Sequence, residues 1–158
     1  MPDVFDKAKR SQIMRSIRSK NTKAELVVFR HLRRRGVYFQ RHYTRVLGSP
    51  DIALPRKKKA VFIDGDFWHG KDFDRLLQKH AADSFWVAKI SGNMERDRRQ
   101  RQSLIEMGWT LLAVWETDIL RKRTREDVLQ KIEDFLVTKD ESGVSSTYPT
   151  TPNEFDYR

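Results

Sequence analysis

The sequence contains no cysteine, and this absence excludes disulfide bonds and metal sites built from thiolates. Long apolar runs are absent too, because no stretch approaches the roughly 20 residues that a membrane-spanning helix needs. The segment from Met1 to Lys7 lacks the hydrophobic centre of a signal peptide. We therefore expect a cytoplasmic protein that makes no membrane contact.

Acidic residues are in the minority. Lys and Arg number 32 against 22 Asp and Glu, which gives a net charge of +10 over 158 residues. A compact basic domain most often binds nucleic acid, although many basic domains do not. The length suits one domain with a single core. The charge therefore favours a polyanionic partner and a location at the nucleoid.

Three segments differ in composition. Residues 1–21 are polar and basic, with apolar residues such as Met14 and Ile17 at helical spacing, and they are too short to fold alone. They predict an arm that docks on a partner. Residues 22–138 form the expected folded domain. Residues 139–158 are rich in Ser, Thr and Pro, so we expect a mobile or surface-draped tail.

The first expected helix begins at a capping-box pair, Thr22 and Glu25, and ends near Gly36. Three short β-prone segments follow, separated by turn residues. Three antiparallel strands are their simplest arrangement. The segments are residues 37–39, 51–54 and 60–63.

The second half predicts two helical stretches, residues 72–90 and 93–107, broken by a loop at 91–92. The near-continuous apolar run at 109–115 is typical of a strand buried on both faces. A last helix is expected at 125–137. The order αβββααβα predicts a three-layer α/β domain around a mixed sheet.

Two aspartates lie at the ends of neighbouring predicted strands. Asp51 begins a strand after Pro50, and Asp64 ends the strand expected to pair with it. Such ends lie side by side in an antiparallel hairpin, so both carboxylates can reach one cation. Mg²⁺ keeps several waters as ligands, and one or two carboxylates suffice to hold it. The bound ion would lower the pKa of an attacking water.

Glu25, His69 and Asp97 complete the candidate constellation, with His69 suited to proton transfer or phosphate contact. Each of the five residues also has a structural alternative. Asp51 fits a turn, Asp64 a strand end, Glu25 the capping box, His69 a structural role and Asp97 a solvated helix face. Together, five such positions at one sheet edge predict a nuclease site.

Large aromatic residues also invite two interpretations. Phe67 and Trp68 directly follow a predicted strand, where the chain should leave the core. Exposed rings beside a basic surface can wedge between base pairs and unstack them. Core packing remains the alternative, and it is the expected role of Trp109 and Trp115 within the buried strand.

Several short motifs, taken in order, resemble the very short patch repair (Vsr) endonucleases over about residues 2–136. These motifs are Arg10-Ser11, Met14-Arg15, Thr22 to Glu25, Pro50-Asp51, Gly65, Phe67-Trp68-His69, Phe85-Trp86, Lys89-Ile90, Asn93, Glu95-Arg96-Asp97-Arg98, Gly108-Trp109 and Val114-Trp115-Glu116.

The resemblance implies a restriction-endonuclease-like fold and Mg²⁺-dependent hydrolysis of one DNA strand, with Mn²⁺ able to substitute. Members of the family nick beside the thymine of a T:G mismatch, the product of 5-methylcytosine deamination. The implied partners are mismatched duplex DNA, mismatch-repair proteins and a repair polymerase. We expect the protein to act as a monomer with one catalytic site per chain.

The resemblance also implies roles for individual residues. Asp51 would bind the metal together with the backbone carbonyl of Ile63. His69 would be the base or phosphate contact, oriented by Asp97, and Glu25 would support the site from its helix. The implied DNA contacts are Met14 and Ile17 in the arm and the intercalating Phe67, Trp68 and Trp86. Apart from the resemblance, the candidates for facing the groove are Lys89, Arg96 and the loop around Tyr43 to Arg45.

The chain departs from the family at its structural zinc. The corresponding positions hold Asp66, Lys71, Phe73 and Thr117, which make no thiolate site, so we expect no structural zinc. An Asp66–Lys71 ion pair and packing by Phe73 are expected to tie down the same loop.

A second departure is Asp64, at a position that varies between histidine and acidic residues in the family. The aspartate is expected to add a metal ligand. The lysine of the general Pro-Asp…(Asp/Glu)-x-Lys nuclease pattern is replaced by Asp66, so His69 would do the work of that lysine.

Two alternative functions remain open on the sequence alone. One is a nicking nuclease of a mobile element or restriction system that acts on paired DNA. The other is a non-catalytic basic protein that binds DNA through aromatic wedges.

Overall fold

The computed structural model describes residues 6–9, 20–80 and 84–139. Met14, Ile17 and the tail from residue 140 lie outside this part of the chain, so the expectations for them stay predictions.

A mixed four-stranded sheet in the order β1-β2-β3-β4 forms the centre of the fold. The strands are β1 (Gln40–Arg41), β2 (Ile52–Leu54), β3 (Lys59–Asp64) and β4 (Thr110–Trp115), and the helices are α2 (Lys23–Arg34), α3 (Phe73–Lys79), α4 (Phe85–Glu106), α5 (Glu116–Leu120) and α6 (Lys122–Val137).

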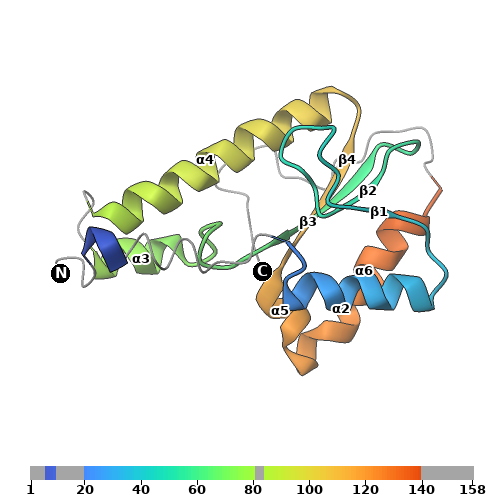
Figure 1. The fold of residues 1–158 in the computed structure, drawn as a ribbon, viewed down its shortest axis with the longest axis horizontal. Coiled ribbons are helices and arrows are strands. Elements are labelled where there is room, and N and C mark those ends of the chain that lie inside the picture. The colour runs from blue at the N-terminus through green and yellow to red at the C-terminus, as the bar shows by residue number, and fades with distance from the viewer. Residues whose placement is uncertain (1–5, 10–19, 81–83, 140–158) are drawn as a thin grey trace.

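Helices cover both faces of this sheet (Figure 1). On one face, α2, α5 and α6 bury the larger hydrophobic core, which includes Phe29, Ile52 and Ile132. On the other face, α4 covers a smaller core that includes Phe62 and Leu104. The expected three-layer, restriction-endonuclease-like architecture is confirmed. No helix in the described residues is long and apolar enough to span a bilayer.

The pairing of the strands brings the site residues to one end of the sheet. β2 pairs antiparallel with both β1 and β3, while β3 and β4 are parallel, with Asp64 opposite Trp115. The hairpin expected from residues 51–54 and 60–63 is therefore present. The expected strand at 37–39 was wrong, because Val37 and Phe39 pack against the core and the ladder forms only at Gln40 and Arg41.

The expected break at Ser91–Gly92 was also wrong, since α4 is one continuous helix of 22 residues. Its N-cap is Ser84, whose hydroxyl accepts the N–H of Val87 at 3.2 Å. Gly92 lies on the exposed side of the helix, and buried side chains continue along one stripe before and after it. A mid-helix glycine costs about 1 kcal/mol, too little to interrupt such a stripe. The stripe comprises Trp86, Val87, Ile90, Asn93, Asp97, Arg101 and Leu104.

The predicted capping box of α2 is confirmed. Thr22 N–H donates to Glu25 Oε2 at 2.8 Å, and Glu25 N–H donates to the Thr22 hydroxyl at 3.3 Å. At the far end of the helix, Glu133 of α6 accepts from Arg35 Nε and contacts His31 Nε2, each at 3.0 Å. These bonds fix α2, and hence Glu25, relative to the sheet.

Thr22→Ala should lower the free energy of unfolding by about 1 kcal/mol, because the N–H of Glu25 loses its acceptor. Thr22→Ser is the control and should stay close to the wild type, since serine caps equally well. Urea denaturation followed by circular dichroism measures both variants. Equal stability of Thr22→Ala and wild type would show that this cap does not stabilise α2.

Candidate active site

Asp51 lies where β2 begins, and its carboxylate points across to β3. Its Oδ2 accepts the backbone N–H of Ile63 at 2.7 Å. A pocket at this end of the sheet is lined by both residues, as well as by His69 and Asp97 from the loop after β3 and from α4. The antiparallel pairing of β2 and β3 therefore brings the backbone N–H of Ile63 next to the carboxylate of Asp51, and the metal-binding role expected of the Ile63 carbonyl stays a prediction.

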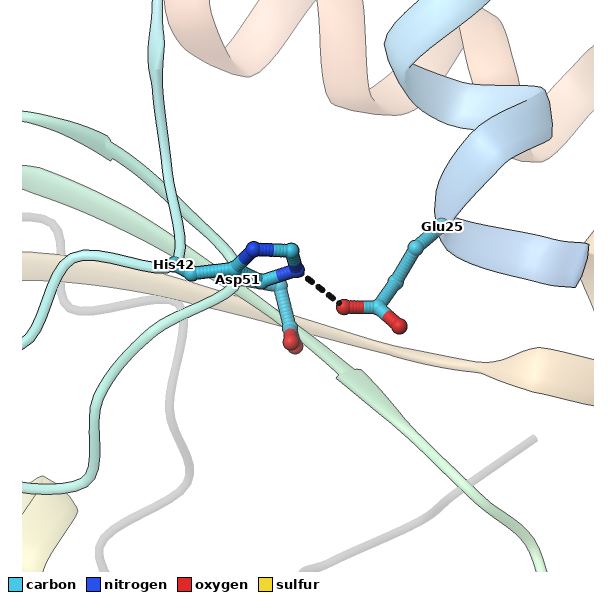
Figure 2. A group of neighbouring side chains, drawn as sticks. All are labelled: Glu25, His42 and Asp51. Carbon is cyan, nitrogen blue, oxygen red and sulfur yellow. Dashed lines mark hydrogen bonds and ion pairs between the residues drawn. The ribbon is translucent and has the colours of Figure 1, made fainter. Parts of the chain in front are cut away.

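Glu25 and His42 join Asp51 from two other elements (Figure 2). Glu25 comes from the first turn of α2, and His42 directly follows β1. One ligand atom of each of the three side chains lies within 4.8 Å of the others. The His42 Nε2 is 2.9 Å from Glu25 Oε1, while the other carboxylate oxygen of Glu25 serves the capping box. Glu25 is thus both a cap and a site residue.

The crowding of carboxylates shifts their protonation. Burial, with the neighbouring charges of Glu25 and Asp64, raises the pKa of Asp51 to about 8 despite its hydrogen bond from Ile63. Burial also acts to raise the pKa of Glu25, but hydrogen bonds from Thr22 outweigh it and the pKa is lowered. Glu116 lines the same pocket, and burial with the charge of Asp66 raises its pKa. A cation would relieve this repulsion.

His69 and Asp97 form a tight pair. Nδ1 of His69 lies 2.5 Å from Oδ2 of Asp97 and 3.8 Å from Oδ1 of Asp64. Burial lowers the pKa of His69, but the Asp97 hydrogen bond and the charge of Asp64 outweigh it, and the pKa is raised. Burial raises the pKa of Asp97, but the His69 hydrogen bond and the charges of His69, Arg101 and Arg96 together outweigh it, and this pKa is lowered. The structure places His69 and Asp97 side by side, while their roles in catalysis stay predictions.

Asp64 occupies a different environment from Asp51. Its Oδ2 and Oδ1 accept from Arg101 Nη1 and Nη2 at 2.8 and 2.6 Å, and both residues are only 3% exposed. The Arg101 guanidinium also stacks over Phe62, 4.3 Å from the ring centroid. Sequence reasoning missed Arg101, although it follows Asp97 by one helical turn on the buried stripe of α4, where an arginine needs a partner.

The aromatic residues gather beside this pocket. Phe67 is 46% exposed and packs edge-on against Trp68 and Trp86, with centroid distances of 4.9 and 5.6 Å. Trp86 itself is only 6% exposed. Asn93, which the sequence motifs name without a role, donates to the carbonyl of Trp68 at 2.9 Å and holds the loop on α4. On the same helix, Lys89 is half-buried and Arg96 is exposed.

Three of the four residues discussed above in place of a zinc site, Asp66, Lys71 and Thr117, make a polar clasp in this chain. The Asp66 carboxylate accepts from the backbone N–H of Thr117 at 3.2 Å and also from the Thr117 hydroxyl. The expected ion pair is present, with Lys71 Nζ 3.4 Å from Asp66. Phe73 is half-buried and lines a small cavity with Phe67. The clasp ties the loop after β3 to α5, and the absence of structural zinc stays a prediction.

A basic mixed-sheet domain with clustered carboxylates and a histidine–aspartate pair at one sheet end has the features of a restriction-endonuclease-like nuclease. The family model described as DNA mismatch endonuclease Vsr matches residues 2–75. The chain is 33% identical over 138 residues to the DNA mismatch endonuclease Vsr of Escherichia coli K12, covering 86% of this chain and 88% of that protein.

Two further relatives are nicking enzymes. The type II nicking enzyme V.HpaIIP of Haemophilus parainfluenzae is 38% identical over 107 residues, which is 67% of this chain and 76% of that protein. V.NmeDIP of Neisseria meningitidis serogroup C, also a type II nicking enzyme, is 35% identical over 135 residues, covering 84% of this chain and 91% of that protein. The chain therefore belongs to the Vsr family and is a DNA endonuclease.

Arg101→Met should destabilise the protein by about 3–5 kcal/mol, because it leaves the buried Asp64 carboxylate without its partner. The double variant Asp64→Asn/Arg101→Met should regain part of this loss, since no unpaired charge stays buried. Urea denaturation of the single and double variants measures the coupling. A loss below about 1 kcal/mol for Arg101→Met would show that the pair behaves as an exposed one.

His69 should titrate above its ordinary pKa of 6.5, and Asp97→Asn should lower that value. Because the pKa of His69 is raised in the folded state, this group stabilises the fold below pH ~6.5, and the contribution is lost as pH rises through the raised value. Imidazole NMR of the metal-free protein measures the pKa, with His31 as internal control. A higher pKa in Asp97→Asn than in the wild type would refute the pairing.

Proposed function

We propose that the protein nicks one strand of duplex DNA beside the T of a T:G mismatch in a Mg²⁺-dependent reaction, and so begins the repair of deaminated 5-methylcytosine. One observation carries the proposal: the Asp51 carboxylate faces the backbone of Ile63 in a pocket that the His69–Asp97 pair also lines. Membership of the Vsr family indicates that the substrate is DNA.

The donor set fits a hard divalent cation. Asp51 and Glu25 offer carboxylate oxygens within 4.8 Å of each other, and the Ile63 carbonyl would add a backbone ligand. Asp64 would join these ligands only by leaving Arg101, so we give it an electrostatic role in the apo protein. Mn²⁺ suits the same oxygen ligands. When bound, the cation would polarise a phosphate oxygen and lower the pKa of the attacking water.

The chain itself supplies the base. Asp97 engages Nδ1 of His69 and fixes the orientation of the ring, which leaves Nε2 to accept a proton from water. Only neutral imidazole can accept that proton. Because the pKa of His69 is raised, the rate of nicking should increase with pH through that raised value.

The exposed ring of Phe67 is suited to wedge into DNA. Trp68 and Trp86 back it, and Asn93 fixes the loop that carries it. A T:G mismatch is easier to unstack than a matched pair, so a rigid wedge discriminates by deformability. Lys89 and Arg96 would contact the groove from α4.

A single site explains a nick in place of a double-strand break. Within residues 6–9, 20–80 and 84–139, only Glu25, His42 and Asp51 form a group of three potential metal ligands. A monomer with one such site cuts one strand per encounter. Mismatch-repair proteins and a repair polymerase would then complete the repair.

A second function has its own support. Two relatives are named type II nicking enzymes, and these names support nicking as the activity. The alternative is a nicking enzyme of a mobile element or restriction system that acts on paired DNA. Such an enzyme would share the site described above and differ in the DNA that it cuts.

Strand-specific nicking of end-labelled duplexes tests the proposal. T:G duplexes and their paired counterparts, with varied flanking sequence, are incubated with Mg²⁺, Mn²⁺ or chelator. We expect nicks only beside the mismatched T, and a loss of at least about 100-fold in Asp51→Asn, because the metal site loses its anion.

Asp127→Asn makes the same chemical change at an exposed position of α6 and should retain full activity. Efficient cutting of paired DNA would favour the restriction-associated enzyme. Full activity with chelator, or in Asp51→Asn, would overturn the metal-dependent mechanism.

A further inference from the structure

His42 is a nitrogen donor beside the proposed cation site, and the mechanism above gives it no role beyond its place in that group of potential metal ligands. Its Nε2 lies 2.9 Å from Glu25 Oε1, and one ligand atom each of Glu25, His42 and Asp51 falls within 4.8 Å of the others (Figure 2). Two oxygens and one imidazole nitrogen therefore converge from three elements of the fold.

The backbone fixes His42 opposite Asp51. The register of β1 and β2 pairs Arg41 with Ile52, and the next step along the strands brings the His42 N–H to the Asp51 carbonyl at 3.0 Å. His42 has a positive φ of 47°, a conformation that few residues other than glycine adopt and that concentrates at functional sites. Its ring packs edge-on against Phe29, with the centroids 5.6 Å apart. The ring is held in place by core packing on one side and Glu25 on the other.

The spacing of two of the donors, one from His42 and one from Glu25, matches that of neighbouring metal ligands. Two ligands about 2.1 Å from one ion and at right angles lie about 3.0 Å apart. The separation of 2.9 Å between His42 Nε2 and Glu25 Oε1 is close to this value. The two atoms can therefore occupy adjacent positions around one cation without a large movement of either side chain.

Imidazole changes which cation the site prefers. Oxygen-only sites suit Mg²⁺, while a nitrogen ligand favours first-row transition metals. We propose that His42 is a direct ligand, and that Glu25, His42 and Asp51 form a mixed nitrogen–oxygen site that binds Mn²⁺ and Co²⁺ in preference to Mg²⁺ before DNA arrives. This inference rests on the proposed function in one respect, because the proposed function is what places the cation at Asp51.

A simpler role for His42 is to hydrogen-bond Glu25 and orient its carboxylate. The two roles differ in whether the imidazole nitrogen touches the ion. A direct ligand transfers electron spin density from bound Mn²⁺ to nitrogen, whereas a hydrogen-bonding histidine leaves the ion with oxygen ligands only.

Pulsed electron paramagnetic resonance of Mn²⁺ bound to the DNA-free, full-length protein makes this distinction. In the wild type we expect modulation from one coordinated imidazole nitrogen, and Mn²⁺ affinity at least about tenfold above that for Mg²⁺. His42→Gln should abolish the nitrogen signal and weaken Mn²⁺ binding by about 10- to 100-fold, while Mg²⁺ affinity changes less than about threefold.

Three controls accompany this variant. His42→Asn repeats the test with a residue that tolerates a positive φ, in case glutamine disturbs the turn. His31→Gln removes a histidine that pairs with Glu133 and should keep the nitrogen signal. His69→Gln should also keep the signal while nicking is lost.

Mn²⁺ bound through oxygen alone, a nitrogen signal that survives in His42→Gln, or no binding without DNA would each overturn the assignment of His42. None of these results would affect Asp51-dependent nicking of mismatched DNA. Conversely, a nitrogen signal at His42 in a protein that cuts no DNA would refute the proposed function and leave the metal site in place.

Discussion

The hydrogen bond from the Ile63 N–H to the Asp51 carboxylate is the interaction on which the site depends. This bond connects Asp51, the residue just before β2, with Ile63 in β3, and so it places a carboxylate against the end of the sheet. Glu25 then approaches from α2, and together with burial it raises the pKa of Asp51 to about 8. A fold that sequesters two acids so close together is less stable without a cation than with one.

Three other acids at or beside the pocket have a cationic or hydrogen-bonding partner. Asp64 is paired with Arg101, Asp97 with His69, and Asp66 with Lys71 and Thr117. Asp51 accepts one hydrogen bond, from the Ile63 N–H, but within the described part of the chain it has no cationic partner and faces the negative charges of Glu25 and Asp64. The negative charge is thus concentrated at the position where phosphodiester hydrolysis needs a divalent ion, inside a protein whose net charge of +10 attracts DNA.

Local signals in the sequence predicted local structure well. The Thr22–Glu25 capping box and the apolar runs of β3 and β4 depend on residues close in sequence, and their placement was confirmed. The break at Ser91–Gly92 was wrong because burial along α4 outweighs one glycine. α5 and the start of α6 at Lys122 were missed, since no capping side chain marks either helix.

Contacts between distant elements were harder to predict. His42 reaches Asp51 only through the register of β1 and β2, and residues 37–39 gave the wrong strand. Arg101 meets Asp64 across 37 positions of sequence, where no local pattern links them. The clasp between Asp66 and Lys71 was predictable because the family resemblance placed both residues in one loop, and the structure adds Thr117 as its anchor on α5.

The central claim is that the buried Asp51 carboxylate destabilises the metal-free protein and binds a cation. Thermal unfolding of the wild type and Asp51→Asn, with and without Mg²⁺, tests this claim. A raised folded-state pKa means that the stability contributed by Asp51 is lost as pH rises from about 4 through about 8. Near pH 8 and without metal, Asp51→Asn should therefore unfold at a higher temperature than the wild type. Added Mg²⁺ should stabilise only the wild type. A variant that is less stable than the wild type, and that still gains stability from Mg²⁺, would contradict the account.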